Sequence, residues 1–201
     1  YSQSLRSEFT TAIYTDGGQV AMEFNVAEAG FDAATAVSQA IQQGATTLVL
    51  VTNTSTLEQA LQVIQVNQGR LALLGGDSLY NPRVLEAGGS NAVGMVVAVP
   101  WILGNNTQSD FVQTSRQLWG GDVNWRTAMA YDATIALADA IRANPTRDGV
   151  ITALSTTGFQ VDGATGTVQF LPSGDRNQAM QLAAVEPSDR TSFGYQFTLV
   201  E

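Results

Sequence analysis

Residues 71–80 read LALLGGDSLY, an apolar run that stops abruptly at two glycines, an aspartate and a serine. The run Leu71–Gly75 is short and continuously apolar, as is typical of a strand that a parallel sheet buries on both faces. In open parallel sheets, ligands bind beyond the carboxyl ends of the strands. The stretch therefore predicts a buried strand that ends in a carboxylate, Asp77, at an edge where a ligand could bind.

Similar apolar runs recur through the first half of the chain. Thr47–Val51 and Gly94–Val99 are predicted as buried strands, and Val20–Val26 alternates enough to be a strand. Helical patterns lie around these runs, and the helices are expected at residues 4–12, 32–43, 55–67 and 81–87. Strands and helices that alternate at roughly 25-residue intervals predict an α/β fold with a doubly wound, Rossmann-like parallel sheet.

Two helix starts carry capping signals. Asp32 precedes a helix whose apolar residues fall at positions 33, 36, 37, 40 and 41, which is the spacing of one buried face. The sequence Ser55-Thr-Leu-Glu58 has the pattern of a capping box and is expected to open the next helix.

The pattern changes after Pro100. Helices are expected at residues 110–118, 127–142 and 147–154, and strands at 167–170, 178–185 and 195–200. No domain linker or low-complexity segment is evident in this half.

Composition excludes several classes of function. The formal net charge is −9, and all nine cationic residues are arginines, so binding to a phosphate backbone is not expected. The chain has no cysteine and no histidine, which excludes disulfides, thiol catalysis, Ser-His pairs and the usual zinc sites. No phosphate-binding glycine motif or Gly-x-Ser-x-Gly elbow occurs. We therefore expect no cofactor, no metal and no enzymatic activity.

The candidate site residues follow two of the predicted strands. Thr52 and Asn53 come after the first strand, and Asp77 and Ser78 after the second. Turn and cap chemistry is favoured for the first pair. For the second pair, capping of the following short helix and contact with a ligand ammonium, amide or hydroxyl group carry equal weight. Trp101 is a weaker candidate, because packing is the commoner role of a tryptophan.

Several segments, taken in order, resemble a known family. They are YSQSLRSEF, FDAATAVSQAIQQGATTLVLV, TLEQALQVIQ, LALLGGDSL, GMVVAVPW and AYDATIALADAI. Their order and spacing are similar to those of type 1 periplasmic solute-binding proteins, in particular the leucine/isoleucine/valine-binding type that serves ABC importers. The resemblance runs from Tyr1 to about Glu186.

The resemblance implies a two-lobed protein that traps a small ligand between its lobes. Carried over residue by residue, the aromatic contact falls on Tyr1 and the acid that binds a ligand ammonium group falls on Asp77, which favours the ligand role for this residue. A further contact, often aromatic in the family, falls on Asn53 and departs from the branched-chain pattern.

The resemblance also implies a truncated two-lobe protein. Residues 1–100 and 178–201 correspond to its second, C-terminal lobe, and residues 101–177 to a largely missing first lobe. The helices between residues 110 and 154 would then expose apolar faces, and self-association is one way to cover them.

The function that follows is binding of an amino acid or a related small amide for an ABC transporter permease, without nucleic acid or covalent chemistry. The alternative is an extracellular sensing domain of a receptor or kinase with the same fold. A metal-dependent enzyme is a distant third. The resemblance implies a periplasmic or extracellular location after a signal peptide is removed. A lipid anchor on a missing N-terminus is a further option.

Overall fold

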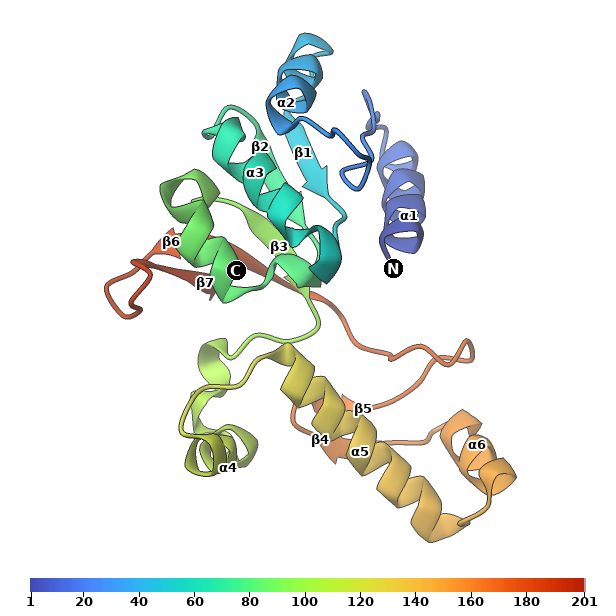
Figure 1. The fold of residues 1–201 in the computed structure, drawn as a ribbon. Helices are drawn as coiled ribbons and strands as arrows, with labels where there is room; N and C mark the ends of the chain where they lie inside the picture. The colour runs from blue at the N-terminus through green and yellow to red at the C-terminus, as the bar shows by residue number, and fades with distance from the viewer. Residues whose placement is uncertain (201) are drawn as a thin grey trace. The chain divides into compact units, whose positions relative to one another are not determined.

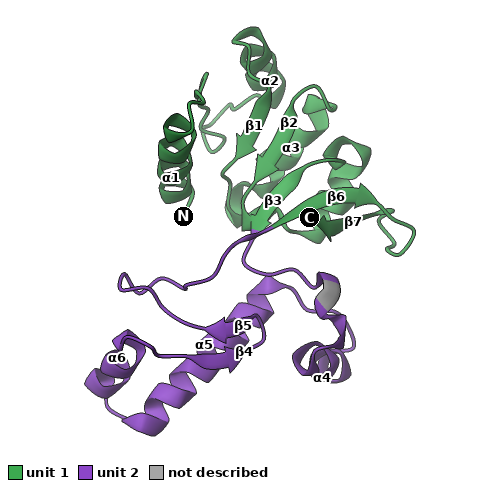
Figure 2. Cartoon of the chain, turned by 180° about the vertical axis from the view of Figure 1, so that it is seen from behind, with its two compact units in different colours: residues 1–98, 182–201 green, residues 99–181 purple. Residues whose placement is uncertain are grey.

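The computed structural model describes the backbone of residues 1–200 and their side chains except at position 105, and the chain divides into two compact units. Unit 1 comprises residues 1–98 together with the residues from 182 onward, and unit 2 comprises residues 99–181 (Figures 1 and 2). Within residues 1–200, none of the helices combines the length and the apolar character needed to span a bilayer.

Unit 1 is built on a five-stranded sheet with the order β1-β2-β3-β6-β7. The strands are β1 (Thr47–Leu50), β2 (Ala72–Gly75), β3 (Val96–Val99), β6 (Gln181–Pro187) and β7 (Tyr195–Leu199). The pairs β1–β2 and β2–β3 are parallel, whereas β6–β7 is antiparallel. The predicted α/β class with a parallel sheet is confirmed.

Helices precede β1 and separate the parallel strands β1, β2 and β3 along the chain, as the rhythm of the sequence predicts. They are α1 (Ser2–Thr15), α2 (Ala33–Gln42), η1 (Thr54–Thr56), α3 (Leu57–Asn67), η2 (Asp77–Leu79), η3 (Val84–Gly88) and η4 (Gly89–Ala92). Asp32 caps α2 by accepting a hydrogen bond of 2.9 Å from the Thr35 amide, as predicted. Hydrogen bonding to Thr35, through its side chain first and its backbone amide second, lowers the pKa of the Asp32 carboxyl. Helix α2 buries Ala36 and Val37, and α3 buries Leu61 and Ile64.

Three expectations need correction. Residues 20–26 form no strand. The capping box involves Asn53 and Thr56 rather than Ser55 and Glu58, because a short 3₁₀ turn precedes α3. The helix expected at 81–87 is wound largely as a π-helix from Val84 to Gly88. The sequence reasoning also missed strand β4 of unit 2, whose three residues are too few to show a period.

Unit 2 consists of helices and one hairpin. Its elements are η5 (Gly104–Gln108), α4 (Asp110–Trp119), α5 (Trp125–Ala143), α6 (Arg147–Ser155), β4 (Val161–Gly163) and β5 (Gly166–Val168). The two strands pair antiparallel with Val161 opposite Val168. Helix α5 packs against both α6 and β4, so the longest helix organises the unit.

A buried carboxylate joins α5 to the hairpin. Asp132 accepts hydrogen bonds from the Ala164 amide and the Thr165 hydroxyl, both at 2.5 Å. The Arg176 guanidinium donates to the same carboxylate at 3.1 Å. Gly163 leaves the space for this approach, since a Cβ atom there would lie 2.3 Å from Asp132 Oδ1. The charge of Asp132 is thus both paired and hydrogen-bonded, as a buried carboxylate requires.

Helix α5 is apolar on two opposite faces. Small residues line the buried face next to Asp132, namely Ala128, Ala136 and Ala140. The opposite face carries Leu137 and Ile141, which are 45% and 49% exposed. A helix that is apolar all round is ordinarily covered on all sides, so the second face is left uncovered within unit 2.

We expect Asp132→Ala to destabilise unit 2 by about 3–5 kcal/mol, because it leaves the Arg176 guanidinium buried without its carboxylate partner. All three tryptophans lie in unit 2, so denaturant unfolding followed by tryptophan fluorescence reports on this unit. Asp139→Ala is the matched control, since Asp139 lies on the same helix with its side chain 51% exposed. Equal unfolding midpoints for Asp132→Ala and Asp139→Ala would contradict the proposed importance of the hydrogen bonds to the Asp132 carboxylate.

Candidate functional site

The carboxyl ends of β1 and β2 lie side by side. The parallel register sets Leu50 opposite Gly75, so the polar residues that follow each strand reach the same edge of the sheet. The structure therefore gathers Thr52, Asp77 and Ser78 at this edge, as parallel strands predict.

Tyr1 joins this edge from the start of α1. Its hydroxyl donates a hydrogen bond of 2.5 Å to Asp77 Oδ1, across a sequence separation of 76 residues. Gly76 makes the approach feasible, because a Cβ atom there would lie 2.6 Å from the Tyr1 hydroxyl and 3.0 Å from a methyl group of Leu5. A glycine before Asp77 is thus required by the packing of Tyr1.

The environment of Tyr1 keeps its hydroxyl protonated. Burial of the hydroxyl end, together with the adjacent Asp77 carboxylate, raises the pKa of the Tyr1 phenol well above its usual value of 10.0. The Tyr1 hydroxyl lies against Gly76, although the residue as a whole is 59% exposed. A carboxylate only accepts hydrogen bonds, so the Tyr1 hydroxyl is the donor and Asp77 the acceptor.

Ser78 ties the two turns together. Its hydroxyl donates a buried hydrogen bond of 2.7 Å to the Thr52 carbonyl. The side chain of Thr52 is itself buried, and its hydroxyl oxygen has no hydrogen-bond partner among the described side chains and backbone. The pair Ser78–Thr52 therefore supports the turn that presents Asp77.

The capping alternative for Asp77 and Ser78 is wrong. The helix expected at 81–87 is η3, whose N-cap is Arg83, and neither η3 nor η2 has a side-chain hydrogen bond at its N-cap. Asp77 accepts from Tyr1 and Ser78 donates to Thr52, so the short helix uses neither side chain as a cap.

Asn53 and Trp101 have structural partners. The Asn53 carboxamide oxygen accepts hydrogen bonds from the Ser55 amide at 2.9 Å and the Ser55 hydroxyl at 2.7 Å, which is the turn chemistry favoured for this position. Trp101 is 3% exposed and packs with Val112 and Phe111 in the core of unit 2. Packing, the commoner role of a tryptophan, is what the structure shows for Trp101.

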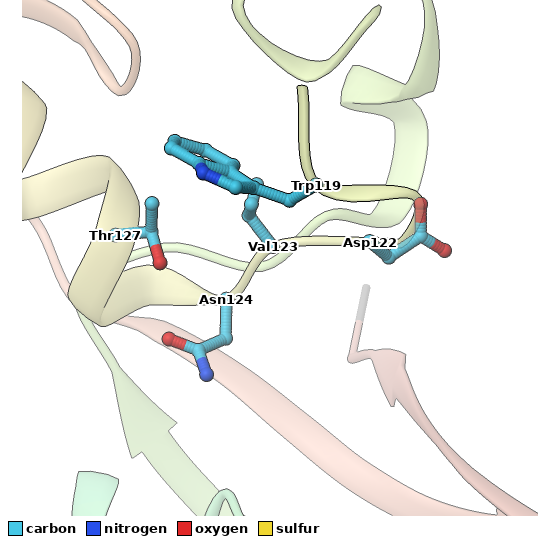
Figure 3. Close-up of a pocket in the computed structure, with 5 residues that line it drawn as sticks. All are labelled: Trp119, Asp122, Val123, Asn124 and Thr127. Atoms are coloured by element: carbon cyan, nitrogen blue, oxygen red, sulfur yellow. The ribbon is translucent and has the colours of Figure 1, made fainter. Parts of the chain in front are cut away.

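The sequence reasoning missed a shallow hollow of about 310 Å³ in unit 2 (Figure 3). It is lined by Trp119, Asp122, Val123, Asn124 and Thr127. Its polar side chains are partly engaged already: Asp122 pairs with Arg116 at 2.5 Å, and the Asn124 carboxamide accepts from the Arg126 amide at 2.9 Å. The only signal for it in the sequence is the turn GGDVN at 120–124, which also reads as a plain loop.

The described residues include no cluster of three or more acidic side chains that could hold a metal ion. At this edge the Tyr1 phenol orients the Asp77 carboxylate. The buried hydrogen bond from Ser78 to the Thr52 carbonyl lies next to it. The carboxylate can accept hydrogen bonds from an ammonium, an amide or a hydroxyl group of a small molecule.

Comparison with known proteins identifies the family. The profile of the periplasmic binding protein family matches residues 1–191. The chain belongs to this family. No curated protein sequence matches it.

Solved structures of periplasmic binding proteins share the fold. A leucine-binding protein from Thermotoga maritima has 21% sequence identity and a TM-score of 0.74, and the match covers 97% of this chain and 56% of that one. An ABC transporter substrate-binding protein from Sphaerobacter thermophilus has 18% identity and a TM-score of 0.79, with 99% and 56% covered.

A third structure holds a different kind of ligand. The solute-binding protein of an ABC transporter from Rhodopseudomonas palustris, in complex with 3,4-dihydroxybenzoic acid, has 18% identity and a TM-score of 0.70, with 96% and 54% covered. The predicted resemblance to type 1 periplasmic binding proteins of the branched-chain amino acid type is confirmed. The chain spans little more than half of the length of the structures that it matches.

In this periplasmic binding protein, Ser78→Ala should lower the free energy of unfolding by about 1–3 kcal/mol, because the buried Thr52 carbonyl loses its donor. Unfolding of unit 1, which has no tryptophan, can be followed by amide exchange. Ser38→Ala, at an exposed position of α2, is the control and should stay within about 0.5 kcal/mol of the parent. Loss of stability in both variants alike would contradict the role given to the Ser78 hydroxyl.

The Tyr1–Asp77 hydrogen bond should be visible in a spectrophotometric titration of the tyrosines. The pKa of the Tyr1 phenol is raised in the folded protein. The protonated phenol therefore stabilises the fold below its unfolded-state pKa, and this stabilisation is lost as the pH rises through the folded-state pKa. The difference between the parent and Tyr1→Phe should be a phenol that titrates above 10.0. Asp77→Asn should lower the pKa at which the Tyr1 phenol titrates. An unchanged pKa would contradict the contact between Tyr1 and Asp77.

Proposed function

We propose that this chain is part of a solute-binding protein of an ABC importer that binds an amino acid or a related small amide. The observation that carries the proposal is the family match over residues 1–191, combined with a carboxylate oriented at the carboxyl edge of a parallel sheet. Closure of two lobes around the ligand is the mechanism, with no covalent step.

In this proposal, unit 1 belongs to the second lobe and unit 2 to the first. Residues 1–100 and 178–201 are assigned to the second lobe, and residues 101–177 to the first. Support comes from the division of the chain, which leaves unit 1 after Ala98 and returns to it at Leu182. The length of the structural relatives also leaves room for the remainder of a first lobe.

Asp77 is assigned to the positively charged or amide end of the ligand. The Tyr1 hydroxyl occupies one side of Oδ1, and a carboxylate has about four acceptor positions, so the group retains acceptor capacity for a ligand. Thr52, Asn53 and Ser78 shape the same edge. Thr52 contributes a buried hydroxyl oxygen without a partner in the described part of the chain, and a ligand or a water could satisfy it.

The partner in transport is an ABC transporter permease, and the location is the periplasm or the outer face of the cell. The family is one of binding proteins, and the absence of histidine, cysteine and lysine is consistent with a non-enzymatic role. A lipid anchor and a removed signal peptide belong to the same proposal.

Asp77→Asn, made in a protein of the full length typical of the relatives, should weaken ligand binding by about 1.5–3 kcal/mol through loss of a charge-assisted hydrogen bond. Titration calorimetry measures the change. Asp189→Asn is the matched control, because Asp189 is an exposed acid of the same unit and its replacement should leave the affinity unchanged. Equal affinity of Asp77→Asn and the parent would refute the assignment of Asp77.

A thermal-shift screen of the same full-length protein against amino acids, their amides and small aromatic acids tests the function as a whole. A ligand at 100 times its Kd stabilises the folded form by about 2.7 kcal/mol. A shift with one class of compound would support the binding-protein proposal and name the ligand class. No shift with any compound would contradict the amino-acid proposal and favour a sensing domain for another ligand.

A further inference from the structure

The chain crosses between the two units twice. It leaves unit 1 after Ala98 and returns to it at Leu182. The connecting segments are residues 99–102, at the end of β3, and residues 178–181, at the start of β6 (Figure 2). Strands β3 and β6 are neighbours in the sheet of unit 1, so the two connecting segments leave that sheet side by side. Both segments belong to unit 2.

The first connecting segment is anchored by burial. Val99, Trp101 and Ile102 are each at most 3% exposed. Trp101 packs with Val112 in the core of unit 2. Apolar contacts therefore hold this segment to the rest of unit 2.

The returning segment has no such anchor. Ala179 and Met180 are exposed, and Gln178 and Gln181 are only half-buried. A segment that buries little apolar surface opens at a low cost in free energy. Another interaction therefore has to hold residues 178–181 in place.

Two glutamine side chains tie the returning segment to the buried one. Gln178 Nε2 donates a hydrogen bond of 2.8 Å to the Pro100 carbonyl. Gln181 Oε1 accepts a hydrogen bond of 2.7 Å from the Ile102 amide. A carboxamide offers a carbonyl acceptor and N–H donors, as a peptide group does. The two side chains thus take the role of backbone ladder bonds where the strands leave the sheet.

Gln178 is also held at its other end. Its Oε1 lies 3.2 Å from the Thr165 hydroxyl, and this hydroxyl donates to the buried Asp132 carboxylate. The Arg176 guanidinium donates to the same hydroxyl at 3.0 Å. The network that joins α5 to the hairpin therefore fixes the position of the Gln178 carboxamide.

We propose that Gln178 and Gln181 form a clamp that makes the two connecting segments move as one element, and that the clamp narrows the range of orientations that the two units take. Without the clamp, the returning segment can separate from residues 99–102. With the clamp, the motion that remains is a bend shared by both segments, which is the behaviour of a hinge. The clamp acts with or without a ligand, so this proposal stands independently of the proposed function.

The test measures distances between two spin labels in the full chain without ligand. Because the chain has no cysteine, single cysteines can be introduced as labelling sites. Ser38→Cys on α2 and Ala133→Cys on α5 place one label at an exposed position of each unit. Double electron–electron resonance then gives the distribution of distances between the labels.

Two variants each remove one bond of the clamp. Gln178→Glu replaces the donor to the Pro100 carbonyl by an oxygen, and Gln181→Ala removes the acceptor for the Ile102 amide. Each variant should broaden the distance distribution. Gln181→Ala should also speed hydrogen exchange of the Ile102 amide by about fivefold or more, since one hydrogen bond is lost.

Two further variants are the matched controls. Gln181→Glu keeps an acceptor for the Ile102 amide, and Gln113→Ala removes a glutamine that bonds Gln108 at the exposed surface of unit 2. Both should keep the distribution of the parent, and tryptophan fluorescence checks that unit 2 stays folded. Parental widths in Gln178→Glu and Gln181→Ala would overturn the proposal. Equal broadening by Gln178→Glu and Gln181→Glu would overturn it as well, because only the first of these two removes a clamp bond.

Discussion

The parallel register of β1 and β2 is the constraint on which the candidate site depends. Because Leu50 lies opposite Gly75, the turn that begins at Thr52 and the turn that contains Asp77 meet at one edge. The serine–carbonyl bond then locks the two turns together, and the glycine at position 76 admits a tyrosine hydroxyl beside the carboxylate. A shift of the register by one residue would turn the side chains of β2 to the opposite face and separate these groups.

Unit 2 depends on a different device, a charge buried in an alanine-rich helix. Asp132 replaces the hydrophobic side chain that such a position would ordinarily carry, and it gathers an amide, a hydroxyl and a guanidinium around itself. The small neighbours on α5 allow the hairpin to come close enough for these bonds. Specific pairing of this kind selects one arrangement of helix and hairpin, whereas apolar contacts alone would tolerate several.

Local patterns predicted the strands β1, β2 and β3 and the helices α2 to α6 well, because apolar runs and caps are local properties. The contact between Tyr1 and Asp77 could be expected only from family resemblance, since nothing local links residues so far apart in sequence. Residues 20–26 show the opposite failure. Their alternation is genuine, but a strand exists only when a neighbour supplies its hydrogen bonds. The exposed Trp119 was missed because composition does not reveal which tryptophan lies outside a core.

The raised pKa of Tyr1 has a consequence for the conditions under which this edge could work. Histidine is the one side chain whose ordinary pKa falls between about 5 and 8, and the chain has none. Burial and the neighbouring Asp77 carboxylate raise the pKa of the Tyr1 phenol, further from neutrality. Hydrogen bonding at the helix cap lowers the pKa of the Asp32 carboxyl, which is also a shift away from neutrality. Acidification or alkalinisation of the surroundings by one or two pH units would therefore leave the proton on Tyr1 in place, and the edge would present the same hydrogen-bond donor throughout.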